Sequence, residues 1–163
     1  MSYKIWHNYG IGFCFSDFED TCDSVGDPIT TEDLERLLAY APDLRESIHE
    51  WLEELKATNS GREITIDDYR DYDELYTLDF AGMFAEVISE AEDLTSVYET
   101  SDYDGNKFVI FGKGYPWQMN DREKSITQGE VEDIFRKYLE VLKPATKDKI
   151  GVDIEDQEIE NGG

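Results

Sequence analysis

The sequence predicts an α+β fold in which helices cover one face of an antiparallel sheet of about four strands. Segments rich in aromatic and β-branched residues, which are typical of strands, occur in two adjacent pairs. Segments with apolar residues at helical spacing lie between these pairs and after the second pair. The expected order is therefore two strands, three to four helices, two strands and a final helix, or ββααα(α)ββα.

The first pair of strands is expected over residues 3–15, where aromatic and branched side chains dominate. Gly10 and Gly12 would permit the chain to reverse around residues 8–10. The polar and acidic residues 16–29 that follow predict a loop.

Helices are expected at four places where apolar residues recur at helical spacing. The first begins at Thr30 or Thr31, and the second begins at Pro42, where a missing N–H costs nothing. The last begins at Thr127, because Glu130 completes a Thr-x-x-Glu capping box. The four expected helices cover residues 30–41, 42–57, 78–92 and 127–142.

The second pair of strands is expected over residues 94–101 and 107–113. Asp104-Gly105-Asn106 joins them and is a strong hairpin signal. Residues 63–78 admit two interpretations, either a strand or a loop with one helical turn.

Residues 1–143 are expected to form a single α+β domain, because 163 residues suit one ordinary core. Residues 144–163 are polar and contain three glycines, so we expect a flexible tail. No apolar run approaches the length of a membrane span, and the N-terminus lacks the layout of a signal peptide. Cys14 and Cys22 are the only cysteines. We therefore expect a cytoplasmic protein.

The net charge of −24 limits the possible partners. Direct binding to nucleic acid or to an anionic membrane is disfavoured, because both would repel the chain. Basic protein surfaces remain. The charge is uneven, since residues 67–104 contain thirteen acids and one base, whereas acids and bases balance over residues 105–142.

The expected helix within residues 67–104 carries a row of carboxylates. Asp79, Glu86, Glu90 and Asp93 fall within an arc of about 60°, apart from the apolar side. They span roughly 21 Å, about the length of six base pairs of duplex. We predict that this row binds a partner by imitating a phosphate backbone. The preceding acid-and-tyrosine segment is its expected extension, through Asp67, Asp68, Asp71, Asp73, Glu74, Tyr69 and Tyr72.

No catalytic residue, metal ligand or cofactor is expected. Asp102-Tyr103-Asp104-Gly105 matches part of a calcium loop, but Thr100 and Phe111 occupy the two key ligand positions. The spacing of the two cysteines and two histidines matches no structural zinc pattern. The sequence also lacks the motifs of nucleophilic and phosphate-binding sites.

Small size, clustered acidity and the absence of a catalytic motif resemble phage and mobile-element inhibitors that mimic nucleic acid, including anti-CRISPR proteins. The resemblance implies a non-enzymatic protein that competes for a basic, nucleic-acid-binding partner. Two alternatives stay open. One is a small acidic enzyme with a carboxylate-lined pocket, and the other is a salt-adapted protein whose acidity serves no partner.

Overall fold

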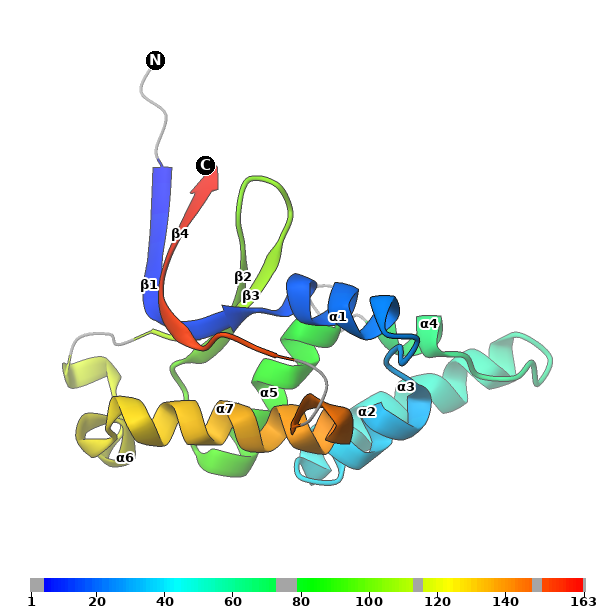
Figure 1. The fold of residues 1–163 in the computed structure, drawn as a ribbon. Coiled ribbons are helices and arrows are strands. Elements are labelled where there is room, and N and C mark those ends of the chain that lie inside the picture. The colour runs from blue at the N-terminus through cyan, green and yellow to red at the C-terminus, as the bar shows by residue number, and fades with distance from the viewer. Residues whose placement is uncertain (1–4, 73–78, 113–115, 148–150, 163) are drawn as a thin grey trace, which may run out of the picture.

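The computed structural model describes residues 5–72, 79–112, 116–147 and 151–162. It contains an antiparallel four-stranded sheet with helices packed against it, which confirms the predicted α+β class (Figure 1). The strands are β1 (Ile5–Cys14), β2 (Val97–Ser101), β3 (Lys107–Phe111) and β4 (Glu155–Gly162). Their order in the sheet is β2-β3-β1-β4.

The helices begin where local capping chemistry allows. The Thr30 hydroxyl accepts a hydrogen bond from the Asp33 amide, and the Asp33 carboxylate accepts one from the Thr30 amide. At the last long helix only one of these two bonds is shown, since the Thr127 hydroxyl accepts a hydrogen bond from the Glu130 amide. The α-helices are α1 (Phe15–Ser24), α2 (Thr31–Leu38), α3 (Pro42–Thr58), α4 (Ile66–Arg70), α5 (Phe80–Glu92), α6 (Asp121–Ser125) and α7 (Gln128–Leu142). Two short 3-10 helices are η1 (Pro116–Gln118) and η2 (Pro144–Lys147).

The core lies between the sheet and helices α5 and α7. Phe13 of β1 contacts Phe84 of α5 and Phe135 of α7, with ring centroids 5.6 and 5.9 Å apart. Helix α5 is buried along most of its length, because the sheet, α2, α3 and α7 all pack on it. This position decides what its acidic residues can do.

The expected strand pair over residues 3–15 is wrong, because Ile5–Cys14 forms one continuous strand. Gly10 and Gly12 serve close approach to β3. A Cβ atom at Gly12 would lie 2.0 Å from the Val109 carbonyl oxygen, and one at Gly10 would lie 2.4 Å from that of Phe111. The glycines therefore let β1 bend across β3 without reversing (Figure 1).

The loop expected over residues 16–29 is also wrong, since its first half belongs to α1. Phe15, Phe18 and Cys22 are buried at i, i+3 and i+7, so an apolar face does exist within the acidic segment. Phe15 packs on Phe18 with ring centroids 5.4 Å apart.

The sheet includes residues that we expected in a flexible tail over 144–163. Strand β4 pairs with β1 from Ile5↔Gly162 to Gly12↔Glu155. An edge strand needs little apolar surface, and here Ile159 is buried while most neighbouring side chains are polar. The predicted order of elements therefore matches only roughly.

Of the two interpretations for residues 63–78, the structure shows one helical turn, α4, within the described part. Residues 73–78 lie outside the described residues.

Candidate acidic binding face

The predicted carboxylate row on α5 is divided among structural roles. Asp79 caps α5 by accepting a hydrogen bond from the Gly82 amide at 2.9 Å, and it lies 3.6 Å from Lys107 Nζ. The Glu90 carboxylate accepts hydrogen bonds from the amides of Asp43 and Leu44, at 3.0 and 3.1 Å. Those amides open α3, so Glu90 caps a neighbouring helix.

Glu86, Glu90 and Asp93 are exposed, and Asp79 is half-buried. Asp93 ends α5 with a left-handed backbone, at φ 53°. Two of the four carboxylates are therefore engaged as helix caps, Asp79 on α5 and Glu90 on α3.

Three residues of the expected extension are buried. Asp68 accepts hydrogen bonds from both terminal nitrogens of Arg62, at 2.9 and 2.7 Å. That pair, with the Thr65 amide, lowers the pKa of Asp68 to about 2. The Tyr69 hydroxyl donates a hydrogen bond to Glu35, and Tyr72 packs edge-on against Trp51. These side chains hold α2, α3 and α4 together and are not available to a partner in this conformation.

Asp67 and Asp71 remain exposed on α4 and at its C-terminal end. Asp73 and Glu74 lie outside the described residues.

Most of the described cations are paired with acids inside the fold. Lys143, whose side chain is 3% exposed, lies 2.5 Å from Asp33 and 2.8 Å from Asp27. Arg122 lies 3.0 Å from Glu92, which also accepts a hydrogen bond from the Tyr138 hydroxyl. These pairs neutralise several of the acids that join elements.

Other carboxylates line two cavities on the sheet side of the molecule. The first, of about 320 Å³, lies among α1, the β2–β3 hairpin and the segment leading into β4. The second, of about 410 Å³, lies between the hairpin turn and β4, and Phe108 lines both. We define the acidic face as the carboxylates that line these cavities: Asp17, Asp102, Asp104, Asp153, Glu155, Glu158 and Glu160. No Lys or Arg is among the described residues that line either cavity.

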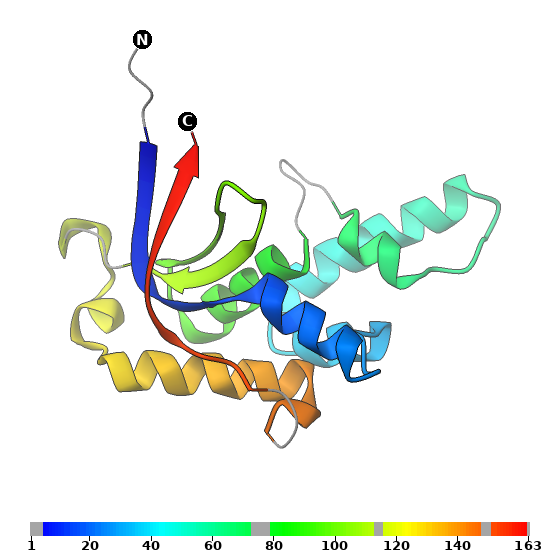
Figure 2. The same ribbon diagram turned by 45° about the horizontal axis from the view of Figure 1, so that its top comes forward.

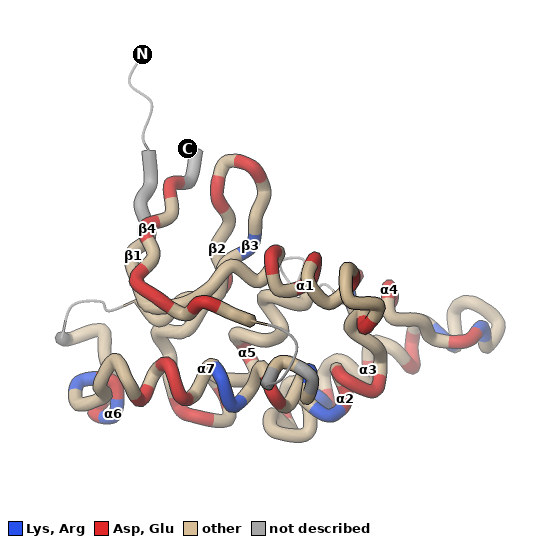
Figure 3. Tube along the Cα trace, viewed as in Figure 1, with Lys and Arg blue, Asp and Glu red and all other residues tan. Residues whose placement is uncertain are grey.

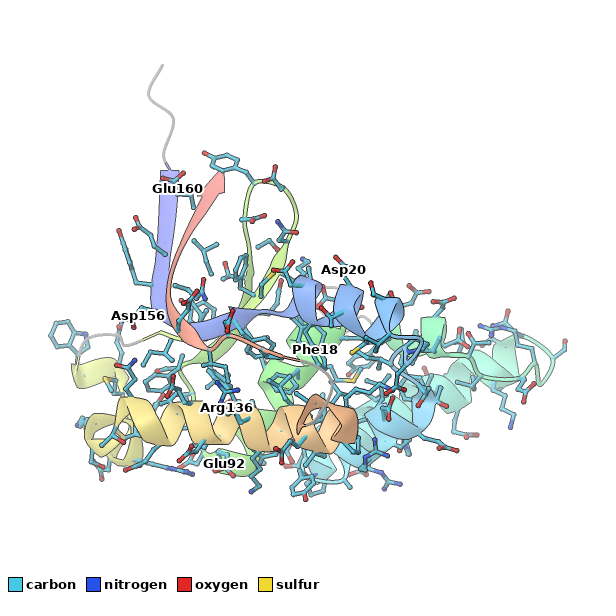
Figure 4. The ribbon with its side chains drawn as sticks, viewed as in Figure 1. Phe18, Asp20, Glu92, Arg136, Asp156 and Glu160 are labelled. Atoms are coloured by element: carbon cyan, nitrogen blue, oxygen red, sulfur yellow. The ribbon has the colours of Figure 1, made fainter. Side chains whose placement is uncertain are left out.

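The distribution of charge is visible along the chain trace. Acidic residues follow β4, the hairpin turn and α1, whereas basic residues gather mainly on helices away from this side (Figure 3). Asp20 on α1 and Glu160 on β4 lie toward the same side of the molecule (Figure 4). Lys107 is the described base nearest the hairpin turn along the chain, and it pairs with Glu99 at 3.2 Å and with Asp79.

Hydrogen bonds within the hairpin turn favour the ionised form of Asp102. The Asp102 carboxylate accepts hydrogen bonds from the amides of Asp104 and Asn106, both at 2.9 Å. Burial acts to raise the pKa of Asp102, but these bonds and one from the Asn106 side chain outweigh it and lower the pKa. Tyr103 projects from the turn and is 60% exposed. The face therefore combines fixed negative charge with an exposed aromatic ring.

Sequence reasoning missed this face because its members come from three distant segments. One signal could have found part of it, since residues 150–163 contain five acids and no base. The polar composition of that segment predicts a tail, and only its pairing with β1 brings it beside the hairpin.

Other kinds of site find less support in the described ranges. Within them, no group of three His, Cys, Asp or Glu side chains is arranged to hold a metal ion. None of the helices that the structure describes is long and apolar enough to cross a membrane. Cys14 and Cys22 are both free thiols. Comparison with protein-family models, curated proteins and solved structures finds no match, so function must be inferred from the acidic face itself.

Proposed function

We propose that this chain is a non-enzymatic interaction protein whose acidic face binds a basic, nucleic-acid-binding protein in place of phosphates. One observation carries the proposal. Seven carboxylates from three segments gather around two adjoining cavities whose described lining residues include no Lys or Arg. A surface of this kind attracts a cationic groove over a long range and speeds association.

The separation of charges supports a binding role. Carboxylates gathered on one surface repel one another and cost stability. The chain places Arg62, Arg122 and Lys143 beside acids that join its elements, whereas no Lys or Arg is among the described residues that line the cavities of the acidic face. Acidity that served only solubility or salt tolerance would be expected to spread more evenly over the surface.

The specific form of the proposal is an inhibitor from a phage or mobile element, such as an anti-CRISPR protein, that acts in the cytoplasm. It would occupy the groove with which a host protein holds nucleic acid. The aromatic ring of Tyr103 would add contact area beside the charges, because Tyr is favoured at protein interfaces.

Charge reversal at matched positions tests the proposal. One variant carries Asp17→Lys, Asp104→Lys, Asp153→Lys and Glu155→Lys, all at exposed positions of the acidic face. The control carries Glu46→Lys, Glu50→Lys, Glu53→Lys and Glu54→Lys on the exposed side of α3, with the same change in net charge.

Both variants and the wild type are used to capture proteins from a cell lysate at low salt. We expect the wild type and the control to retain basic nucleic-acid-binding proteins that elute with added salt and with duplex DNA. The face variant should lose them while keeping its circular dichroism spectrum. Equal capture by both variants would show that the acidic face has no special role.

A further inference from the structure

Strand β4 ends the sheet with an edge that no described strand pairs. Its partner in the sheet order is β1, and β2 forms the opposite end. The sheet curls, so that β2 and β4 approach each other, and in both views the open edge of β4 faces the β2–β3 hairpin (Figures 1 and 2). The cavity of about 410 Å³ lies between them, lined by Phe108 and Ile159 together with the acids of the hairpin turn and of β4.

An open strand edge presents N–H and C=O groups that can pair with another chain. Natural edge strands are commonly protected by Lys, by Pro or by a bulge. Strand β4 has eight residues with no Lys and no Pro, and its register with β1 is continuous from Glu155 to Gly162. Its charged residues are all acids: Glu155, Asp156, Glu158 and Glu160.

These acids determine which chain can add to the edge. Two copies of β4 side by side would set carboxylates against carboxylates, and like charges on neighbouring strands are destabilising. A strand bearing Lys or Arg would instead place opposite charges across the pair, which is stabilising. The edge therefore discriminates against a second copy of this chain and favours a basic one.

The spacing of the acids suits an extended segment. Asp156, Glu158 and Glu160 alternate along β4, so they lie on one side of the strand at intervals of about 6.8 Å. The Tyr9 hydroxyl lies 3.5 Å from Glu158 and orients it. Asp102 and Asp104 of the hairpin turn stand across the same cavity.

We propose that an extended basic segment of the partner adds as a strand to the open edge of β4, in the groove beside the hairpin. Backbone hydrogen bonds to β4 hold it, and its basic side chains, at every second position, face the carboxylates. Apolar side chains at the intervening positions contact Phe108 and Ile159. This inference rests on the proposed function and specifies how the partner is held.

The probe is a short fluorescent peptide of alternating Lys and Val residues, titrated into the full chain and followed by fluorescence anisotropy. Two further peptides have the same sequence, and each is N-methylated on one of the two alternating sets of amides. Because only one set of amides faces β4, we expect one methylated peptide to bind about tenfold or more weakly and the other to bind like the parent. Hydrogen exchange at the amides of β4 should slow when the parent peptide binds.

Protein variants locate the site. Glu158→Lys with Glu160→Lys should weaken binding of the parent peptide about tenfold or more, because two attractions become repulsions. Glu50→Lys with Glu53→Lys on α3 makes the same change in net charge and should leave binding unaltered. Unchanged exchange at β1 amides in the free variants shows that β4 stays in place.

Several outcomes would overturn the inference while leaving the proposed function standing. If both methylated peptides bind like the parent, association is by charge alone. If the two protein variants bind equally, the groove is not the site. If sedimentation shows a dimer that dissociates when the peptide is added, a second copy of this chain occupies the edge of β4. If the peptide does not bind although basic proteins are still captured through the acidic face, strand addition is wrong.

Discussion

The buried ion pairs of Lys143 give a sharp test of how the charges inside this fold act. Lys143 follows α7 and is 3% exposed, and its ammonium lies 2.5 Å from Asp33 and 2.8 Å from Asp27. The contact ties the C-terminal end of α7 to the N-terminal end of α2. Lys143→Met keeps much of the side-chain length and removes the charge.

The structure sets the size of the expected loss. Two charge-assisted hydrogen bonds disappear, each contributing about 1.5–3 kcal/mol. Asp27 is half exposed and regains water, while buried Asp33 keeps Arg36 at 2.6 Å and the Thr30 amide at 2.9 Å. The cost should thus lie near the lower end of the 3–5 kcal/mol typical of a broken buried pair, at about 3 kcal/mol.

Urea unfolding followed by circular dichroism measures this loss, with Lys124→Met on exposed α6 as the matched control. We expect the control to stay within about 0.5 kcal/mol of wild type. A Lys143→Met protein that also stayed within about 0.5 kcal/mol would refute the reasoning, because it would mean that the buried ion pairs contribute almost nothing.

The same pair predicts a dependence on pH. Burial acts to raise the pKa of Asp33, but hydrogen bonds from Lys143, Thr30 and Arg36 outweigh it and lower the pKa. The contribution of ionised Asp33 to stability is therefore present above the pKa of an Asp in the unfolded chain, about 3.9, and is lost as the pH falls through its lower pKa in the folded chain. The pKa of Lys143 is raised, since its bonds to Asp27 and Asp33 outweigh desolvation, so its contribution disappears only above about pH 10.4. The loss of wild-type stability on acidification should be shallower in Lys143→Met.

Three further changes test other contacts. Glu90→Ala removes the acceptor for two amides of α3 and should lower the free energy of unfolding by about 1 kcal/mol in urea. Gly12→Ala places a methyl group 2.0 Å from the Val109 carbonyl oxygen and should cost about 1–3 kcal/mol or more, seen as a lower Tm. In the wild type, ionised Asp68 contributes to the free energy of unfolding above about pH 4, and this contribution is lost as the pH falls toward the folded pKa of Asp68, about 2. Asp68→Asn should lack this contribution, so the acid-unfolding curves of the two proteins should converge at low pH.

The helices that the sequence predicted well are those whose signals are local. Helices α2, α3 and α7 combine an apolar side with a nearby start signal at Thr30, Pro42 or Thr127, and all three signals lie within one turn of the helix they begin. The α+β class followed from the alternation of such segments. Neither conclusion required knowledge of distant contacts.

Apart from the loop expected over residues 16–29, where the local apolar face of α1 was missed, the errors involve pairing between segments far apart in the chain. Gly10 and Gly12 satisfy a turn pattern, and only their closeness to β3 makes them a bend within one strand. Strand β4 contains few apolar residues, because its backbone is paired by β1 at the opposite end of the sequence. Glu90 is predicted from the sequence to bind a partner, whereas α3 places two backbone amides beside its carboxylate.

Charge density along the sequence and charge on the surface therefore measure different things in this protein. Six of the eleven described acids in residues 67–104 are engaged in caps, turns or ion pairs: Asp68, Asp79, Glu90, Glu92, Glu99 and Asp102. The densest acidic stretch is thus largely structural, whereas the acidic face draws most of its members from elsewhere. Reversing Asp68 or Glu90 should consequently lower stability more than binding, and reversing Asp153 and Glu155 should lower binding more than stability. The opposite pattern in paired unfolding and capture measurements would indicate that the partner binds the acids of α5 and not the acidic face.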